Sequence, residues 1–304
     1  MSGIEADEAA RRAPVLGQSG AEISIIDRAG VTAVRKSAAA ESGRARLGTQ
    51  AQKHAEAGRH LAGTGVHVPR ILDDWDGWSY VMEYVPSLPL GSYVATASPR
   101  NVASVVQATV SVLRAELDAS SRDGAALADT RAAFVAKVTS LSPQPAADDA
   151  PTDLGQAHRL VSRATRVLTA HAPSLTIPRG WNHGDFSYEN LLVNARTAEV
   201  SAIDFLDSPV ETPLVDIGRI LLDGEHGWWV SSGSRSSSEI LASRVLARSV
   251  RELAGHQGIG SAEISAFTML AALRVLPYTR TPLRRATLLN ALKAGLAMME
   301  DRTT

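Results

Sequence analysis

The sequence predicts an α+β fold of two lobes, a small antiparallel β lobe followed by a larger, mostly α-helical lobe. Short β-like segments separated by turns fill residues 13–86, whereas residues 87–304 carry apolar side chains at the spacing of α-helices. Pro86 and Pro89 mark the change of pattern. We therefore expect a flexible N-terminus at residues 1–12, an N-lobe and a C-lobe, with a ligand cleft between the lobes.

The N-lobe pattern begins with a β-hairpin. Residues 23–26 and 31–34 are rich in apolar and β-branched side chains and flank a turn that contains Gly30. A proline-free helix with a thin apolar face is predicted next, at residues 41–62. Two more strands follow and complete the lobe, at residues 71–72 and 78–85, joined by a turn at Asp76 and Gly77.

The C-lobe pattern is helical on both sides of a short β-rich island. Helical spacing predicts helices at residues 102–117, 157–168, 240–253, 264–276 and 283–299. The island contains two apolar segments, at residues 191–193 and 200–203. Polar and proline-containing stretches at residues 143–153 and 231–238 indicate loops.

Composition excludes several classes of protein. The 304 residues include no cysteine, which rules out disulfide scaffolds, thiolate zinc sites and cysteine nucleophiles. The formal net charge of -1 gives no global field for nucleic acid or an anionic membrane. The acidic N-terminus lacks an apolar signal segment, and no uncharged apolar run is long enough to span a membrane. We expect a cytoplasmic protein without nucleic-acid or membrane partners. The sequence does not indicate its oligomeric state.

The island begins and ends with polar residues suited to phosphoryl transfer. Residues 183–190 read His-Gly-Asp-Phe-Ser-Tyr-Glu-Asn, so Asp185 and Asn190 share one loop, and a hairpin from Leu191 would return Asp204 to it. Phosphoryl transfer needs a carboxylate near the attacking hydroxyl and oxygen ligands for a metal ion, and Mg²⁺ prefers such ligands. The alternative is an ordinary turn at the loop and a strand cap at Asp204.

This segment resembles the catalytic loop and metal-binding strand of the aminoglycoside phosphotransferase and choline kinase group, which has a protein-kinase-like fold. The matching motifs are H-G-D-x-x-x-x-N and I-D-F, within a resemblance that covers about residues 15–222. The resemblance implies ATP and Mg²⁺ as cofactors. It implies Asp185 as catalytic base, Asn190 and Asp204 as Mg²⁺ ligands, His183 as loop organiser and Asp216 as a buttress of the loop.

The resemblance extends to the nucleotide site of the N-lobe. Lys36 ends the second strand of the hairpin and matches the lysine that holds the α- and β-phosphates. Ser19 lies in a Gly-Gln-Ser-Gly segment that fits the phosphate-covering loop, and Glu83 and Val85 fit the hinge whose backbone contacts adenine. Taken alone, these features also fit a solvated edge lysine, an ordinary turn and a strand end.

Two departures from the kinase pattern stand out. Leu206 follows Asp204 and Phe205 where protein kinases have glycine, and no helical glutamate is an obvious partner for Lys36. Distance along the chain favours Glu56, with Gln52 and Glu41 as alternatives. Counting back from Val68 and Pro69 leads instead to Lys53 or His54.

The acceptor is expected to be a small molecule with a hydroxyl group. Arginines are frequent after Leu206 and balance the acidic residues, which is unfavourable for a polycation. A sugar, polyol or glycan precursor is therefore favoured over an aminoglycoside. The alternatives are a nucleotide-binding pseudokinase that serves as a scaffold and, ranked below it, a protein kinase, because residues 204–216 leave no room for a long activation loop.

Overall fold

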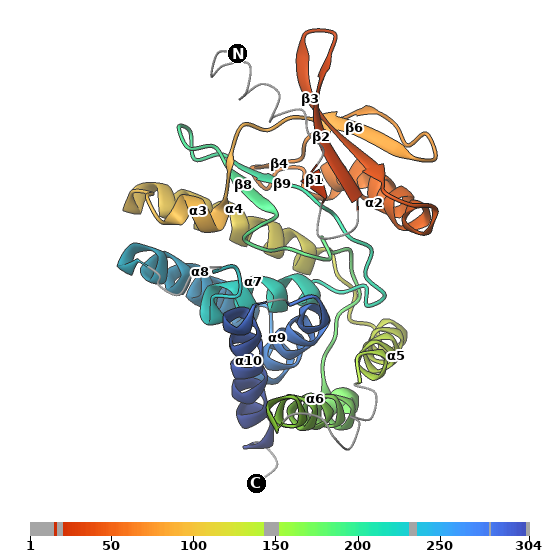
Figure 1. Cartoon of the computed structure of the whole chain (residues 1–304). Coiled ribbons are helices and arrows are strands. Elements are labelled where there is room, and N and C mark those ends of the chain that lie inside the picture. The colour runs from red at the N-terminus through yellow and green to blue at the C-terminus, as the bar shows by residue number, and fades with distance from the viewer. Residues whose placement is uncertain (1–14, 17–20, 143–151, 231–235, 280, 302–304) are drawn as a thin grey trace.

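The structure is a computed structural model that describes residues 15–16, 21–142, 152–230, 236–279 and 281–301. A small antiparallel sheet lies at one end of the molecule and the other end is mostly helical, which confirms the predicted α+β fold of two lobes (Figure 1). Among the described helices, none combines the length and the apolar character that crossing a membrane requires.

Five antiparallel strands form the N-lobe sheet in the order β1-β2-β3-β6-β5. They are β1 (Val15–Leu16), β2 (Ala21–Arg28), β3 (Val31–Ala38), β5 (Ile71–Asp73) and β6 (Ser79–Glu83). The β2–β3 hairpin turns through Ala29 and Gly30, whose φ angles of 54° and 82° are those of the type I′ turn that suits a two-residue hairpin. The predicted hairpin is confirmed, and it places Lys36 on β3.

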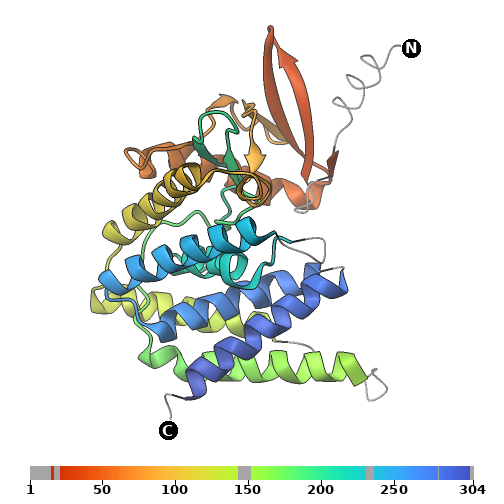
Figure 2. The same cartoon turned by 90° about the vertical axis from the view of Figure 1, so that its left-hand side faces the viewer.

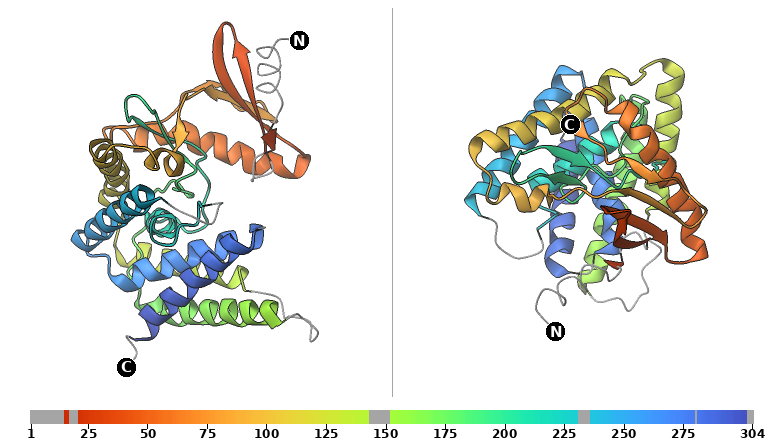
Figure 3. Two further views of the ribbon diagram at one scale, coloured as in Figure 1. Left: turned by 60° about the vertical axis from the view of Figure 1, so that its left-hand side comes forward. Right: turned by 90° about the horizontal axis from the view of Figure 1, so that it is seen from above.

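Helix α2 (Glu41–His60) covers the side of this sheet that faces the helical lobe (Figures 1 and 3). Its apolar stripe is as thin as the sequence indicates, because Leu47 and Ala51 carry the contact with Tyr80 and Met82 of the sheet. This small core fixes α2 against the N-lobe sheet.

A second, four-stranded sheet joins the two halves of the chain. Its order is β4-β9-β8-β7, formed by β4 (Val66–His67), β7 (Leu88–Pro89), β8 (Leu191–Val193) and β9 (Val200–Ala202). The pair of β4 and β9 is parallel, and the other two pairs are antiparallel. The predicted β-rich island is thus the β8–β9 hairpin, and it pairs with strands from the first third of the chain.

The described helices of the C-lobe pack in layers, with α6 beneath α10 at the end far from the N-lobe sheet (Figures 1 and 2). They are α3 (Leu90–Val94), α4 (Pro99–Asp118), α5 (Gly124–Ser140), α6 (Thr152–His171), α7 (Leu214–His226), α8 (Ser237–His256), α9 (Ser261–Val275) and α10 (Pro282–Glu300), with short 3₁₀ turns at residues 172–174 and 276–278. The five predicted C-lobe helices correspond to α4, α6, α8, α9 and α10.

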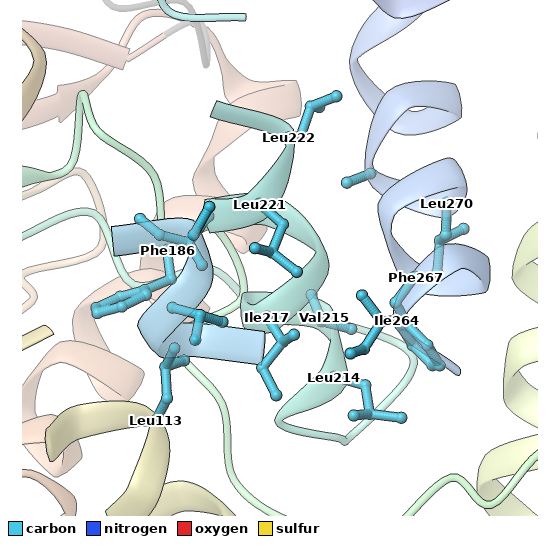
Figure 4. Close-up of a cluster of buried hydrophobic side chains, with 14 of the residues drawn as sticks. Leu113, Phe186, Leu214, Val215, Ile217, Leu221, Leu222, Ile264, Phe267 and Leu270 are labelled. Carbon is cyan, nitrogen blue, oxygen red and sulfur yellow. The ribbon is translucent and has the colours of Figure 1, made fainter. Parts of the chain in front are cut away.

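Helix α7 lies in the middle of the main core and positions the functional loop. Each of its residues from Leu214 to Gly224 is buried, including the charged Asp216, Arg219 and Asp223. Its side chains Leu214 and Val215 lie beside Ile264 and Phe267 of α9 (Figure 4). A Cβ on Gly218 would lie 2.4 Å from the carbonyl carbon of Phe267, so only glycine permits this approach of the two helices.

Candidate active site

The 183–190 loop rests on one carboxylate of α7. Asp216 is fully buried and accepts hydrogen bonds from three backbone N–H groups, those of His183 (2.5 Å), Gly184 (2.9 Å) and Phe186 (3.3 Å). Three amides on one carboxylate fix the path of the loop at its start. The geometry thus gives Asp216 the buttressing contacts that the resemblance implies.

The loop also crosses the segment after β9 at very short range. Gly184 has a φ of +89°, and a Cβ there would lie 2.0 Å from the carbonyl oxygen of Leu206. The backbone N–H of Leu206 donates to the carbonyl oxygen of His183 over 2.9 Å. Glycine is required at this position both for its backbone conformation and for the close approach.

Asp185 is held on two sides and open on a third. Its Oδ1 accepts from Nε of Arg219 (2.8 Å) and its Oδ2 from Nδ2 of Asn190 (3.0 Å), while 27% of the side chain stays exposed. Burial acts to raise the pKa of Asp185, but the charges of Arg219 and Arg274 outweigh it and hold that pKa below its usual value. Asp185 is therefore an oriented, ionised carboxylate.

Arg219 is a site residue that the sequence prediction did not assign. It lies one turn after Asp216 on α7, is 5% exposed at its side chain, and bridges Asp185 and Asp223; its Nη1 lies 2.9 Å from Asp223 Oδ1. Asp223 in turn accepts the backbone N–H of Tyr188 over 2.8 Å. The spacing i, i+3 and i+7 of these three α7 residues puts them on one helix face, which was the available signal.

The β8–β9 hairpin brings Asn190 and Asp204 to the same end of its two strands. The backbone N–H of Ile203 donates to the carbonyl oxygen of Asn190 over 3.0 Å, so Asp204 follows directly on this contact. Asn190 uses its Nδ2 on Asp185, which leaves Oδ1 as an acceptor, and Asp204 keeps 32% of its side chain exposed. An amide oxygen and a half-exposed carboxylate are hard ligands that fit Mg²⁺, an ion that keeps several of its waters in proteins.

Lys36 completes this group from the N-lobe. Its Nζ bonds to Oδ1 of Asp204, and its side chain is buried against Tyr80. Burial acts to lower the pKa of Lys36, but the carboxylate of Asp204 and the hydroxyl of Tyr80 outweigh it and raise that pKa. Ser19, the predicted phosphate-loop residue, lies outside the described residues.

The predicted helix partners of Lys36 are wrong in this structure. Glu56, the favoured candidate, accepts from Gln52 over 3.3 Å, and Glu41 accepts from Arg44 over 2.8 Å. The register of α2 turns other residues toward the site. His54 packs edge-on against Phe205 and bonds to the carbonyl oxygen of Pro69 (2.6 Å), and Lys53 reaches the C-lobe. Lys53 and His54, the residues reached by counting back from Val68 and Pro69, are therefore the α2 residues that face the site.

The predicted hinge lies at the end of β6. The backbone N–H of Glu83 donates to the carbonyl oxygen of Arg70 over 2.9 Å, and the Glu83 carboxylate lies 3.3 Å from Nε2 of His67. Val85 follows the strand and forms no backbone hydrogen bond with another described residue. The backbone of Val85 is thus available to a ligand, whereas the Glu83 amide is engaged.

Arginines from two further helices contact the 183–190 loop. Nη2 of Arg274 on α9 donates to the Gly184 carbonyl oxygen over 3.1 Å. Nη2 of Arg284 on α10 lies 3.3 Å from Oε1 of Glu189 and 3.1 Å from the carbonyl oxygen of Trp229. These two arginines, which were not assigned individually from the sequence, therefore contact the site directly.

The sequence model of the APH phosphotransferase enzyme family matches residues 31–287, from β3 to α10. The chain belongs to this family. The match spans both lobes and every described residue of the site above. A comparison with curated proteins finds no match.

Solved structures of small-molecule kinases share the fold. A glucosamine kinase bound to glucosamine, ADP and inorganic phosphate has a TM-score of 0.61 at 14% identity, over 96% of this chain and 82% of that one. An ethanolamine kinase of Plasmodium vivax has a TM-score of 0.53 at 11% identity, over 95% and 83% of the two chains. The streptomycin–ATP complex of APH(2")-IIa has a TM-score of 0.51 at 13% identity, over 98% and 96%. At such identities the likeness shows the protein-kinase-like fold alone.

Family membership supports a small-molecule phosphotransferase enzyme and leaves its substrate class open. The resemblance stated from the 183–190 loop is thereby confirmed. The glucosamine kinase structure contains ADP and the APH(2")-IIa structure contains ATP, which implies nucleotide use in this fold.

Proposed function

We propose that this protein is an ATP- and Mg²⁺-dependent kinase that transfers the γ-phosphoryl group to a hydroxyl group of a small molecule. The observation that carries the proposal is the setting of Asp185. Its carboxylate is fixed by Arg219 and Asn190, stays partly exposed, and shares the loop with Asn190, which the β8–β9 hairpin brings to the same end of its strands as Asp204. An oriented carboxylate beside a nucleotide site is the arrangement that phosphoryl transfer requires.

Asp185 would act mainly by orienting the acceptor hydroxyl. Its lowered pKa makes it a weak base, so it accepts the proton late, as the oxygen–phosphorus bond forms. A loose transition state places little demand on an early base, and correct alignment supplies most of the effect. Arg219 serves this role by preventing Asp185 from turning away from the acceptor.

The nucleotide side would use the other predicted residues. Asn190 and Asp204 are proposed to hold Mg²⁺, which when bound neutralises charge on the β- and γ-phosphates. Lys36 would contact the α- and β-phosphates after parting from Asp204. Backbone groups at Glu83 and Val85 are proposed for adenine.

The acceptor is proposed to be a sugar, polyol or glycan precursor. Three arginines from three different helices contact the loop around Asp185, at Asp185 itself, Gly184 and Glu189. A polycationic acceptor would be repelled by this arrangement unless additional carboxylates surrounded it. The glucosamine kinase relative, whose structure contains a sugar, supports the fold's capacity for such an acceptor.

The test is transfer of label into small molecules. Purified protein is incubated with Mg²⁺, γ-labelled ATP and a small-molecule extract, beside Asp185→Asn as control. Labelled product from the wild type alone supports the proposal, and mass spectrometry of that product identifies the acceptor. Undiminished turnover by Asp185→Asn on the same acceptor would refute the assigned role.

A pseudokinase scaffold is the second candidate. One observation favours it, since Lys36 bonds directly to Asp204 and no α2 carboxylate holds it in place for phosphates. Slow ATP hydrolysis that disappears in Asp185→Asn would count against a scaffold. A protein kinase ranks third, and label on a protein in a lysate would support it.

A further inference from the structure

Lys53 belongs to helix α2 of the N-lobe, yet its hydrogen bonds go to the C-lobe. Its Nζ donates to Oδ1 of Asn182 (3.1 Å) and to the carbonyl oxygen of Leu206 (2.5 Å). It also lies 5.8 Å from the centroid of the Trp181 ring, within cation–π range. Asn182 directly precedes the 183–190 loop, and Leu206 lies two residues after Asp204. One ammonium group thus contacts both segments that carry the site.

Both acceptors of Lys53 are themselves fixed. Asn182 donates its Nδ2 to the carbonyl oxygen of Val210 (3.2 Å), so its Oδ1 is the end that faces Lys53. The Leu206 carbonyl oxygen is the group that leaves no room for a side chain on Gly184. Lys53 therefore acts on the point where the loop crosses the segment after Asp204.

Beneath this crossing lies a pair of buried carboxyl groups. Glu116 of α4 is 3% exposed and interacts with the carboxyl group of Asp216 and the backbone of His183. Burial and the charge of Asp216 raise the pKa of Glu116 well above its usual value, which favours the protonated acid. Burial raises the pKa of Asp216 to about 6, and the charge of Lys53 opposes that rise. Lys53 thus stabilises the charge of the carboxylate that holds the loop amides.

A helix carboxylate on Lys36 would tie α2 to β3 within the N-lobe, but Glu56 and Glu41 bond elsewhere. We propose that Lys53 provides a different anchor for α2: it is a positioning residue that couples α2 to the 183–190 loop and to the Asp204 segment of the C-lobe. The inference rests on the proposed function. It differs from a helix–lysine pair in that it acts on the loop with Asp185 directly, not on the lysine of the phosphate site.

Three variants test this role. Lys53→Met keeps the apolar stem and removes the ammonium, Lys53→Arg keeps a cation, and Arg59→Met removes a charge from the exposed last turn of the same helix as control. Removing a side chain that positions a catalytic group typically lowers activity about 10–100-fold, so we expect kcat of Lys53→Met to fall by that factor. The KM for ATP should change by less than about threefold, because Lys36 and Asp204 remain. Lys53→Arg should recover most of kcat.

A second measurement does not depend on turnover. Hydrogen–deuterium exchange is followed in peptides covering residues 181–190 and 203–210, with folded state checked by thermal unfolding. Lys53→Met should exchange faster in the first peptide, where the amides of His183, Gly184 and Phe186 bond to Asp216. Arg59→Met should match the wild type in both peptides.

The two measurements separate the inference from the proposed function. If the wild type transfers phosphate and Lys53→Met keeps kcat within about twofold of it, or if Lys53→Met changes only the KM for ATP, the positioning role is overturned. If no acceptor is phosphorylated by the wild type, the proposed function fails, and exchange decides on Lys53 alone. Faster exchange in residues 181–190 then supports the coupling, and unchanged exchange overturns it.

Discussion

Replacing Arg219 by methionine should separate the stability of the site from its chemistry. The change removes a guanidinium that is 5% exposed at its side chain and strands Asp223, which is fully buried, together with the partly exposed Asp185. Breaking a buried ion pair from one side costs about 3–5 kcal/mol. Uptake of a proton by Asp223 limits the cost, because protonating an ordinary aspartate requires about 4 kcal/mol at pH 7 and only about 1.5 kcal/mol at pH 5. We therefore expect a loss of unfolding free energy of about 3–4 kcal/mol at pH 7 and below about 2 kcal/mol at pH 5.

The assay is urea unfolding at both pH values, with Arg219→Met/Asp223→Asn as the matched control. The double variant leaves no uncompensated buried charge, and its asparagine can still accept the Tyr188 amide, so it should regain most of the stability at pH 7. It should not regain turnover, because Asp185 still lacks the group that orients it. A loss below about 1 kcal/mol at pH 7, or equal losses at the two pH values, would refute the reasoning.

Two further predictions concern the 183–190 loop. Gly184→Ala should prevent folding or lower kcat by about 100-fold or more, because its Cβ would lie 2.0 Å from the Leu206 carbonyl oxygen. Gly255→Ala, whose Cβ would lie in open space, should leave kcat unchanged. Circular dichroism checks the folding of both variants and steady-state kinetics checks their kcat. Burial lowers the pKa of His183 to about 4, so the folded protein binds fewer protons than the unfolded chain between pH 4 and 6.5. This group alone should lower the unfolding free energy by roughly 3 kcal/mol as pH falls through that range, so the wild type should lose more stability, or gain less, than His183→Asn. Parallel urea-unfolding profiles of the two proteins would contradict this.

The sequence predicted those site residues that belong to one continuous motif. Asp185, Asn190 and Asp204 lie within twenty residues, and a hairpin is a local structure whose return can be foreseen from two apolar segments. Lys36 could be placed for the same reason, since it ends a hairpin with a recognisable turn. Asp216 became a candidate only through the family resemblance.

Contacts that depend on helix packing were not predictable in the same way. Helix α7 carries Asp216, Arg219 and Asp223 on one face, but the burial of that face against the 183–190 loop is a tertiary contact, so Arg219 was not assigned to the site. Helix α5 buries alanine and threonine beside Phe134 and Val138, which weakens its apolar pattern. The choice of Glu56 for Lys36 failed because the rotation of α2 is set by Leu47 and Ala51 against the sheet. Such rotations follow from tertiary packing rather than from spacing along the chain.

Removing the charge of Lys36 should cost little unfolding free energy, whereas removing the charge of Arg219 should cost much more. Lys36→Met strands only Asp204, which is 32% exposed and can be solvated, whereas Arg219→Met strands a carboxylate without exposure. The exposure of the partner left behind decides the cost, so Lys36→Met should lower the unfolding free energy by about 1 kcal/mol or less. Its KM for ATP should rise, because the cation for the phosphates is lost. Urea unfolding and isothermal titration with Mg-ATP measure both effects. A stability loss as large as that of Arg219→Met would show that the Lys36–Asp204 pair is a structural ion pair and not a pair that opens for nucleotide.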